Sequence, residues 1–506
     1  MNSGLVRKHK FHLRIEHLWG LALLMGIFIF VNTHPIRPHD FWWHIAVGRE
    51  ILTTRNIPTV DIYSYTEAGQ PYPSYQMFWL MEITLYELYK LGGPALVIFV
   101  FSLIITAGYS IIFTICKVVS NDWRVAAAGI FFAAALGLND WNIRPQGITF
   151  LIASLFLLAI YKYNKSLQWS WLIILPLGML VWVNSHGTFV IGLAIIGIWW
   201  GDFLWQAVKQ HLILKLPFTL RSMIYPSIFL GITVLSCLIN PRGLGIIDYI
   251  KTLTGNSVVQ NLVTEWAPPS FNTMMGTAFL LGLMGTAILL ALSPKRPNFY
   301  QTITFLVFGV LSLKTSRGIV WFGIVMAPIV VDHLSAVIRQ LRNIEKRPTV
   351  GGGSRGLNIL FAILLVGMGI LSLPWFKDFL PLPPAKAGLI STETPVQAVN
   401  FLLDEKPPGR LFNAMSFGSY LIWAAYPQYQ VFVDSRIELF SEKVWVDYLN
   451  ISNANGDWEA LLNDYEVDTL MLSQMEQPLL ISAVDLSPDW HPIYEDQVTR
   501  LYIRNK

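Results

Sequence analysis

Runs of about twenty consecutive apolar residues recur along most of this chain, and they constrain its fold more than any other feature. A helix of that length crosses the hydrocarbon core of a bilayer, where every backbone N–H and C=O group must be bonded inside the segment. Composition agrees, because 54% of the residues are hydrophobic and only 13% are charged, against about 25% charged in a typical soluble domain. We therefore predict an all-α polytopic membrane protein. Hydropathy predicts about eleven spans, near residues 17–34, 92–116, 125–138, 147–163, 170–185, 188–206, 223–240, 272–292, 301–314, 317–333 and 357–374.

Lysine and arginine collect in every second loop between these spans, which predicts the orientation of the chain. Cytoplasmic loops of membrane proteins carry an excess of Lys and Arg. The alternation therefore places the N-terminus in the cytoplasm and about the last 130 residues outside. These basic residues lie in short loops rather than in one patch, so no nucleic-acid partner is predicted. The positions are Arg7, Lys8, Lys10, Arg14, Lys117, Arg124, Lys162, Lys165, Lys209, Lys215, Arg221, Lys295, Arg296, Arg339, Arg342, Lys346, Arg347 and Arg355.

With this orientation the outer side of the membrane receives almost all of the polar motifs. They read RPHDFWWH, PTVDIYSYTEAGQPY, LNDWNIRPQ, VNSHGT, INPRGLG, VTEWAPP and KTSRG. Ionisable groups at membrane depth are costly and mark function more often than structure. The asymmetry between the two sides therefore predicts a functional site on the outer face.

The chain beyond about residue 375 has a different pattern. It opens with the Pro-rich linker LPLPPAKAG and continues as short apolar runs separated by turns. GRLFNAM, YQVFVDSR, VDTLMLS and TRLYIRNK are typical of buried strands, whereas TETPVQAVNFLLDE and GDWEALLNDYE have the helical period and capping residues. We predict a small α/β extracytoplasmic domain over 376–506, after a transmembrane domain over 1–375 whose first outer loop is 35–91. Cys116 and Cys237 lie far apart within apolar runs, so no disulfide framework is expected.

An aspartate, Asp40, directly follows the first predicted span in the motif RPHDFWWH. An acid at this place can cap a helix, hold a metal or act as a general base. Several outer carboxylates around one cavity would favour the base, and the catalytic candidates are Asp40, Asp61 and Asp140. Asp40 and His44 share a helix face at i,i+4 spacing. A divalent metal is a further option as cofactor, although no tight motif defines its ligands.

Three arginines at outer span ends are candidates for binding a phosphate: Arg144 in NIRPQG, Arg242 in NPRGLG and Arg317 in KTSRG. The planar guanidinium suits phosphate oxygens. Snorkelling at the interface is the alternative for any single arginine, and three on the side opposite to the positive-inside bias weaken it. His186 is equally compatible with a buried, satisfied histidine. The candidates for substrate contact are Trp43, His44, His186, Glu265 and Trp266.

The first outer loop, HDFWWHIAVGREILTTRNIPTVDIYSYTEAGQPYPSYQMFWLMEI, resembles that of the GT-C fold of polyprenyl-phosphate-dependent glycosyltransferases. These enzymes, which include mannosyl-, aminoarabinose and oligosaccharyltransferases, have an acid just beyond the first span and an outer loop whose helices lie along the membrane. The resemblance implies that Asp40 acts as base or orients the acceptor. With RPQ, NSHG, NPRG and VFVDSR, most of the chain is similar to a bacterial group of GT-C-like membrane proteins, a likeness that brings no established substrate. It lacks the adjacent Asp-Glu of the mannosyltransferases and the WWDYG-type motif of the oligosaccharyltransferases.

Together these features predict a hexosyltransferase-like enzyme of the bacterial plasma membrane. It would move a sugar from a polyprenyl-phosphate donor to an extracytoplasmic glycan, lipid or protein, with Asp40 as base. Such a reaction needs cations for the leaving phosphate, an acid residue for the acceptor hydroxyl and aromatic rings for the sugar. The expected partners are the lipid-linked donor and the bilayer. The alternatives are a non-catalytic GT-C-like assembly factor and a lipid or solute transporter, although a transporter favours inverted repeats and helices broken at mid-membrane.

Overall fold

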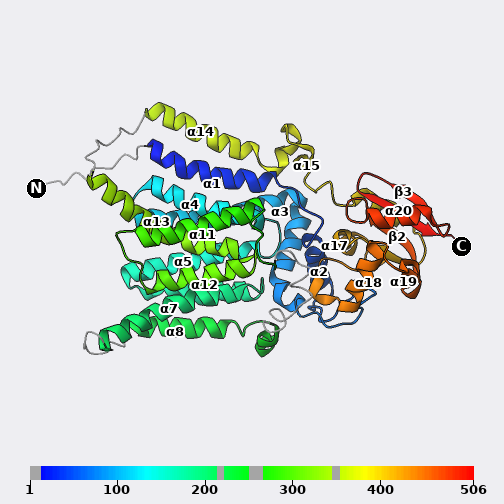
Figure 1. Ribbon diagram of the computed structural model, residues 1–506, viewed down its shortest axis with the longest axis horizontal. Helices are drawn as coiled ribbons and strands as arrows, with labels where there is room; N and C mark the ends of the chain where they lie inside the picture. Colours follow the sequence, from blue (N-terminus) through cyan, green and yellow to red (C-terminus); the bar gives the residue numbers. More distant parts are fainter. Residues whose placement is uncertain (1–12, 213–220, 250–265, 345–353, 506) are drawn as a thin grey trace, which may run out of the picture.

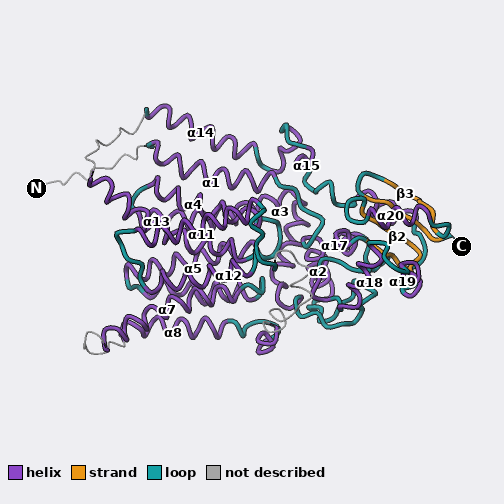
Figure 2. The backbone as a smooth tube through the Cα atoms, in the orientation of Figure 1, coloured by secondary structure: helices purple, strands orange, loops and turns teal. Residues whose placement is uncertain are grey.

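The structure is a computed structural model that describes residues 13–212, 221–249, 266–344 and 354–505. Helices run side by side along the long axis of the molecule, and a smaller domain with a sheet lies at one end (Figure 1). Figure 2 shows the strands gathered at this C-terminal end, away from the long helices. A mostly helical chain with a small C-terminal sheet is therefore confirmed.

Six helices in the described ranges are long and apolar enough to cross a membrane. They are α1 (Ile15–Thr33), α3 (Tyr75–Ser120), α5 (Gly147–Ser166), α7 (Phe189–Leu212), α11 (Met274–Leu292) and α13 (Gly318–Ile344). Shorter helices of the same bundle are α4 (Trp123–Gly137), α6 (Ile174–Val183), α8 (Arg221–Ser236), α12 (Phe299–Lys314) and α14 (Arg355–Leu371). Each predicted span coincides with one of these helices. That about eleven of them cross a membrane stays a prediction.

The burial of these helices separates a central helix from peripheral ones. Helix α13 packs against α4 and α12, and 83% of its most apolar 18-residue stretch is buried inside the protein. In α11 only 22% of the corresponding stretch is buried. Large apolar side chains such as Leu281 and Ile288 of α11 and Ile363 of α14 are exposed. A continuous apolar belt of this kind is stable against lipid and costly against water. The chain is therefore an integral membrane protein.

The long helix α3 consists of two helices joined at a break. Gly93 has φ +61° and ψ −161°, a backbone conformation open essentially to glycine, and Pro94 starts the second helix. The part before the break belongs to the predicted first outer loop, together with α2 (Phe41–Thr54). Figure 1 shows α2 and α17 (Met415–Ala424) between the bundle and the C-terminal sheet. The break therefore turns the chain from the outer loop into the bundle.

The C-terminal domain contains a four-stranded sheet in the order β1-β2-β4-β3, with β1 and β2 parallel and the other pairs antiparallel. The strands are β1 (Arg410–Asn413), β2 (Val467–Ser473), β3 (Trp490–Glu495) and β4 (Thr499–Arg504). Its further helices are α15 (Pro384–Ala387), α16 (Val396–Glu405), α18 (Glu442–Ser452), α19 (Trp458–Asp464) and α20 (Pro478–Leu486). The short 3₁₀ helices in the described ranges are η1 (Leu138–Asp140), η2 (Trp169–Ile173), η3 (Gly243–Gly245), η4 (Pro374–Phe379) and η5 (Ile437–Leu439).

Three of the four predicted strands and both predicted helices of this domain are present, as β1, β2, β4, α16 and α19. The prediction of a strand in YQVFVDSR was wrong, because the segment forms only an isolated bridge. Val431 of this segment forms an isolated parallel bridge with Ser64 of the first outer loop, and its backbone bonds Tyr63 and Tyr65. β3 was not predicted, because its residues WHPIYE do not alternate clearly between apolar and polar.

The first outer loop and the tail are joined at several further places. Ile36 bonds Leu389 and Ser391 through the backbone. The guanidinium of Arg49 lies 4.5 Å from the ring centre of Trp423 and donates to its carbonyl oxygen. Through these contacts, two segments that are more than 300 residues apart in the sequence pack against each other at the end of the bundle. The division of the chain near residue 375 stays a prediction.

Candidate active site

Asp40 lies at the start of α2, where the predicted helix cap can be examined directly. It occupies the N-cap position, yet its backbone is helical (φ −47°, ψ −36°) and its side chain bonds no backbone N–H. Instead, Asp40 Oδ2 lies 3.5 Å from Arg144 Nη1. The side chains are 28% and 15% exposed. The carboxylate therefore takes part in an open ion pair rather than in capping the helix.

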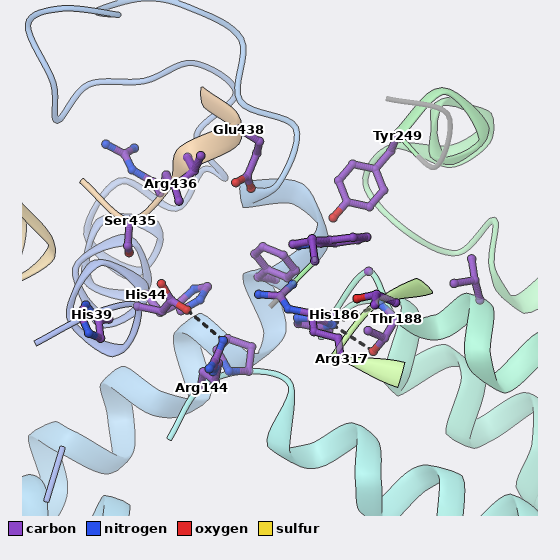
Figure 3. Close-up of a pocket in the computed structure, with 18 of the residues that line it drawn as sticks. His39, His44, Arg144, His186, Thr188, Tyr249, Arg317, Ser435, Arg436 and Glu438 are labelled. Atoms are coloured by element: carbon purple, nitrogen blue, oxygen red, sulfur yellow. Dashed lines mark hydrogen bonds and ion pairs between the residues drawn. The ribbon is translucent and has the colours of Figure 1, made fainter. Parts of the chain in front are cut away.

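A cavity of about 480 Å³ lies beside this ion pair, between the bundle and the C-terminal domain (Figure 3). Its wall comes from segments that are far apart in the sequence. Of the candidates from the sequence, it brings together Asp40, Trp43, His44, Arg144, His186, Trp266 and Arg317. Residues that sequence reasoning missed also line it, chiefly Tyr72, Tyr249, Ser435, Arg436 and Glu438.

The two arginines enter the cavity from different helices. Arg144 follows η1 and precedes α5, whereas Arg317 directly precedes α13. The guanidinium carbon of Arg317 lies 5.3 Å from the ring centre of Trp266. Ser316 bonds the carbonyl oxygen of Ala267 through its backbone N–H (2.9 Å) and its hydroxyl, which fixes the segment that carries Trp266. Two cations and an aromatic face therefore share one cavity.

Two of the histidines that line the cavity, His44 and His186, use their Nδ1 atoms within the protein. His44 Nδ1 lies 3.1 Å from Glu82 Oε1, and His186 Nδ1 lies 3.0 Å from Thr188 Oγ1. Burial, followed by Arg144, holds the pKa of His44 well below its ordinary value. Burial, followed by Arg317, does the same for the pKa of His186. Both rings are therefore neutral at physiological pH.

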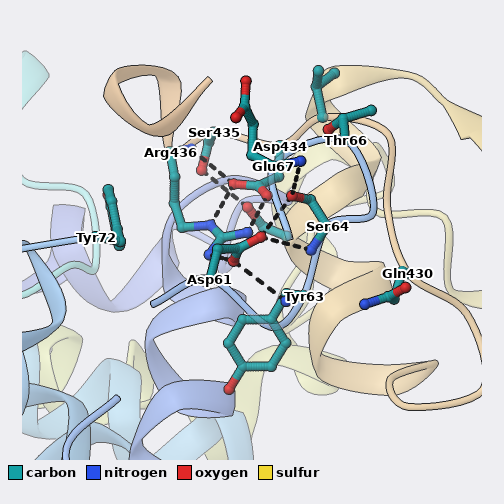
Figure 4. A network of polar contacts seen from close by, with 12 residues as sticks. Asp61, Tyr63, Ser64, Thr66, Glu67, Tyr72, Gln430, Asp434, Ser435 and Arg436 are labelled. Atoms are coloured by element: carbon teal, nitrogen blue, oxygen red, sulfur yellow. Dashed lines mark hydrogen bonds and ion pairs between the residues drawn. The ribbon is translucent and has the colours of Figure 1, made fainter. Parts of the chain in front are cut away.

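Asp61 is placed in a buried cluster, which we call the Arg436 cluster: Asp61, Tyr75, Asp434 and Arg436 (Figure 4). Arg436 Nη1 lies 2.5 Å from Asp61 Oδ1 and also bonds the Tyr75 hydroxyl. Its Nε and Nη2 bond the two oxygens of Asp434 at 2.8 and 2.6 Å. Burial works to raise the pKa of Asp61, but Arg436 and the bonds from Ser64 outweigh it, and the pKa is lowered.

The remaining predicted site residues lie elsewhere. Arg242 donates from Nη1 to Gln76 Oε1 at 3.1 Å and from Nε to the carbonyl oxygen of Gly245, so it bonds the first outer loop and its own turn rather than the cavity. Asp140 ends η1 and is absent from the residues that line the cavity in the described part of the chain. Glu265 lies outside the described residues.

A signal for the missed residues was present in the sequence. Arg436 closes VFVDSR, in which a buried apolar run ends in an acid and an arginine, and Glu438 follows two positions later. Glu438 accepts hydrogen bonds from the hydroxyls of Tyr72 (2.7 Å) and Ser74 (3.2 Å) in the first outer loop. Nothing in the sequence states that the tail reaches this loop, and for this reason residues 435–438 were not predicted as part of the site.

A smaller cavity of about 190 Å³ adjoins the first and shares His39, Asp40 and Arg144 with it. The Asp40–Arg144 pair thus lies between two hollows. Across residues 13–212, 221–249, 266–344 and 354–505, no three His, Cys, Asp or Glu side chains are grouped so as to hold a metal ion. The option of a divalent metal therefore has no ligand set within those ranges.

A helical membrane bundle, an acid beyond its first helix and a C-terminal domain with a small sheet agree with the GT-C architecture that the motifs of the first outer loop implied. No protein-family model and no curated protein matches the sequence. Comparison of the fold with solved structures therefore supplies the independent test.

Three membrane glycosyltransferases have a similar fold. The archaeal oligosaccharyltransferase AglB from Archaeoglobus fulgidus, solved with an inhibitory peptide and a dolichol-phosphate, matches 96% of this chain and 74% of its own (TM-score 0.52, 12% identity). ArnT from Cupriavidus metallidurans, bound to undecaprenyl phosphate, matches 96% of this chain and 97% of its own (TM-score 0.50, 11% identity). The arabinofuranosyltransferase AftD from Mycobacteria matches 96% of this chain and 41% of its own (TM-score 0.54, 12% identity). The chain therefore has the GT-C fold, and the predicted resemblance is confirmed at the level of the fold.

Proposed function

We propose that this protein transfers a sugar from a polyprenyl-phosphate donor to an acceptor on the extracytoplasmic side, with Asp40 as the general base. The observation that carries the proposal is the convergence of Asp40, Arg144 and Arg317 on one cavity at the end of the apolar bundle that meets the C-terminal domain. Two of the enzymes with this fold were solved with dolichol-phosphate or undecaprenyl phosphate. A lipid phosphate in the same place here would put its tail against the bundle and its head in the cavity.

Different residues of the cavity would have different roles in the reaction. Arg144 and Arg317 would hold the phosphate oxygens, on which negative charge grows as the bond between the sugar carbon and the phosphate oxygen breaks. Asp40 would take the proton from the acceptor hydroxyl, whose oxygen forms the new bond to the sugar carbon. Asp40 contacts Arg144 through Oδ2 at 3.5 Å, and its other carboxylate oxygen, for which the described residues provide no hydrogen bond, would face the acceptor.

Trp43 is suited to contact the sugar. Its side chain lines the cavity and is 4% exposed. Within the described part of the chain, its buried Nε1 has no hydrogen-bond partner. A buried donor without a partner costs free energy unless a ligand accepts its hydrogen bond. A sugar hydroxyl is such an acceptor, and Trp266 and Trp321 offer further aromatic surface in the same cavity.

The test compares Asp40→Asn with the wild type and with Glu393→Gln, an exposed carboxylate of the outer domain. We expect Asp40→Asn to keep its expression and thermal stability and to lose about 10²–10⁴-fold in sugar transfer, because an amide does not accept the acceptor's proton. Consumption of a radiolabelled polyprenyl-phosphate sugar in membranes measures the rate. Wild-type turnover by a well-folded Asp40→Asn protein would overturn the role of Asp40 as base.

The same measurements separate the other candidate functions. A non-catalytic assembly factor would bind the polyprenyl phosphate without consuming the sugar donor. A transporter would move the donor across a vesicle membrane with the sugar–phosphate bond intact. The enzyme breaks that bond, so free polyprenyl phosphate accumulates with time.

A further inference from the structure

Helix α2 presents three residues at i,i+4 spacing on one face: Asp40, His44 and Gly48. The first two line the cavity. At Gly48 the helix touches the backbone carbonyl of Glu82 on α3, and a Cβ atom would overlap with that oxygen. This close approach of the two backbones brings the side chain of Glu82 to His44, behind the cavity wall.

Glu82 is a buried acid that the proposed reaction does not use. Its side chain is fully buried, and Oε1 lies 3.1 Å from His44 Nδ1. Among the described residues, its Oε2 has no hydrogen-bond partner. A buried carboxylate with so few partners costs several kcal/mol, so the protonated, uncharged acid is the more stable form here. Its O–H then donates to Nδ1 of the neutral imidazole.

The second histidine is held in an equivalent way by different groups. His186 Nδ1 accepts the backbone N–H of Thr188 at 3.2 Å and lies 3.0 Å from Thr188 Oγ1. That hydroxyl oxygen accepts Trp182 Nε1–H, which leaves its own proton to point at Nδ1. Because Nδ1 accepts and the ring is neutral, the imidazole proton lies on Nε2.

We propose that His44 and His186 are neutral Nε2–H donors to the phosphate in the cavity, and that Glu82 is a positioning residue that holds His44 in this tautomer. The proposal rests on the proposed function for the identity of the phosphate. Figure 3 shows both rings around the same cavity as Arg144 and Arg317. Two directed, uncharged donors would add hydrogen bonds to a phosphate that gains charge as the sugar leaves, without adding further cations to a buried site.

If the proton between Glu82 and His44 lay on His44 Nδ1 instead of on Glu82, the two residues would have a different role. If Glu82 were ionised, it would accept Nδ1–H, and Nε2 of His44 would become an acceptor able to act as base in place of Asp40. In that arrangement the negative charge of Glu82 is essential. In the proposed one, only a donor at the position of Oε1 is needed, and an amide supplies it.

The tautomer can be measured directly with full-length protein in lipid nanodiscs. Nitrogen-15 NMR of ¹⁵N-histidine-labelled protein at pH 7 distinguishes a protonated from an unprotonated ring nitrogen, and the loss of signals in His44→Gln assigns His44. We expect Nδ1 unprotonated and Nε2 protonated. The positive charges of Arg144 and Arg436 also disfavour the protonated form of the His44 ring. A protonated Nδ1 would overturn the proposal.

Binding of undecaprenyl phosphate tests the consequence for the ligand. His44→Gln places an amide N–H at the reach of Nε2, whereas His44→Asn places it at the reach of Nδ1. We expect affinity within about threefold of wild type for Gln and about tenfold weaker for Asn, since a hydrogen bond to a charged group contributes about 1.5 kcal/mol or more. His491→Asn, an exposed histidine of the outer domain, serves as the control. Equal affinity of the Gln and Asn variants with wild type would overturn the proposal.

Glu82 is tested by the pair Glu82→Gln and Glu82→Leu, which have similar volume. Glu82→Gln should stay within about threefold of wild type in binding and in turnover, and Glu82→Leu should bind about tenfold more weakly. If Glu82→Gln lost turnover as completely as Glu82→Leu, the charge would be essential and the proposal wrong.

Competition by inorganic phosphate separates recognition of the head group from recognition of the lipid tail. If the wild type bound neither form of phosphate, the proposed function would fail, while the NMR measurement would still decide the tautomer of His44.

Discussion

Two pairs of aspartate and arginine lie close to the same cavity, and their surroundings are opposite. Asp40 and Arg144 meet in one contact of 3.5 Å, and both side chains are partly exposed. Asp61 and Arg436 meet at 2.5 Å, and both are fully buried. In the second pair each of the three guanidinium nitrogens donates to a protein oxygen. Burial and the distance between the charged atoms, rather than residue type, therefore distinguish the two pairs.

The energetic consequences of the two pairs differ accordingly. An exposed ion pair contributes about 0–1 kcal/mol, so a ligand can replace one partner at small cost. Removing one partner of a buried pair leaves an uncompensated charge and costs about 3–5 kcal/mol. The rings of Tyr63, Tyr72 and Tyr75 lie 5.5 to 5.9 Å from the guanidinium carbon of Arg436 and exclude water from it. The Arg436 cluster thus holds the first outer loop against the C-terminal domain, whereas the side chains of Asp40 and Arg144 remain accessible from the cavity.

The largest effect on stability is expected for Arg436→Met. This change leaves the carboxyls of Asp61 and Asp434 buried without their cation, so we expect a loss of about 3–5 kcal/mol. Differential scanning fluorimetry and size-exclusion chromatography of the purified protein measure it. Arg144→Met, at the partly exposed pair, should destabilise the protein less than Arg436→Met does.

A triple variant sharpens the comparison. Asp61→Leu/Asp434→Leu/Arg436→Met replaces the whole charged group by apolar side chains, and much of the stability lost in Arg436→Met should return. A stable Arg436→Met protein would show that the cluster does not hold the wall, and Asp61 would again be a candidate for catalysis.

A smaller effect, on ligand affinity alone, is expected at the cationic side of the cavity. Arg317→Ala should weaken binding of undecaprenyl phosphate about 10–100-fold, and Arg317→Lys should weaken it less, because lysine keeps the charge and loses the planar fork. Arg242→Ala is the matched control, since Arg242 bonds Gln76 and Gly245. Isothermal titration of each variant in nanodiscs measures the affinity. Unchanged binding in Arg317→Ala would leave this residue as an interfacial anchor.

The two groups should also respond to acid in separate pH ranges. The lowered pKa of His44 means that the folded protein binds fewer protons than the unfolded chain below pH 6.5, so this contribution is full above that pH and declines as pH falls. The lowered pKa of Asp61 gives stability that is present above about pH 4 and is lost below it. Melting temperatures between about pH 2 and pH 8 should show both declines. His44→Gln should remove only the decline in melting temperature that begins near pH 6.5. If the pH dependence of the melting temperature were unchanged in that variant, a buried neutral His44 would be contradicted.

The smallest perturbation tests the orientation and should leave folding and activity unchanged. A cysteine at the exposed Asn453 should react with a membrane-impermeant thiol reagent added from outside, and one at the exposed Arg296 should not. The native Cys116 and Cys237 are buried and should stay unreactive. Labelling at Arg296 alone would invert the orientation and place the cavity on the cytoplasmic side.

The sequence by itself determined the fold resemblance, most of the helices and several of the residues that line the cavity. Spans can be predicted because the bilayer imposes one requirement, a continuous apolar stretch with internally bonded backbone, on each segment separately. The same local reasoning identified Asp40, Arg144 and Arg317, since a charged residue at the end of a span is visible without knowledge of its neighbours. It also predicted β1, β2 and β4, which carry their apolar runs within single segments.

Only the tertiary structure decided which of these residues share a cavity and which aspartate is free to react. Asp61 and Asp40 are equivalent in the sequence, as acids in polar outer segments, but Arg436 is 375 positions from Asp61 and no local pattern connects them. The register of Val431 with Ser64, the contact of Gly48 with Glu82 and the approach of Glu438 to Tyr72 are likewise long-range. Burial sets the charge and the available hydrogen bonds of a side chain. It arises only when distant segments pack together, so it is a property of the fold.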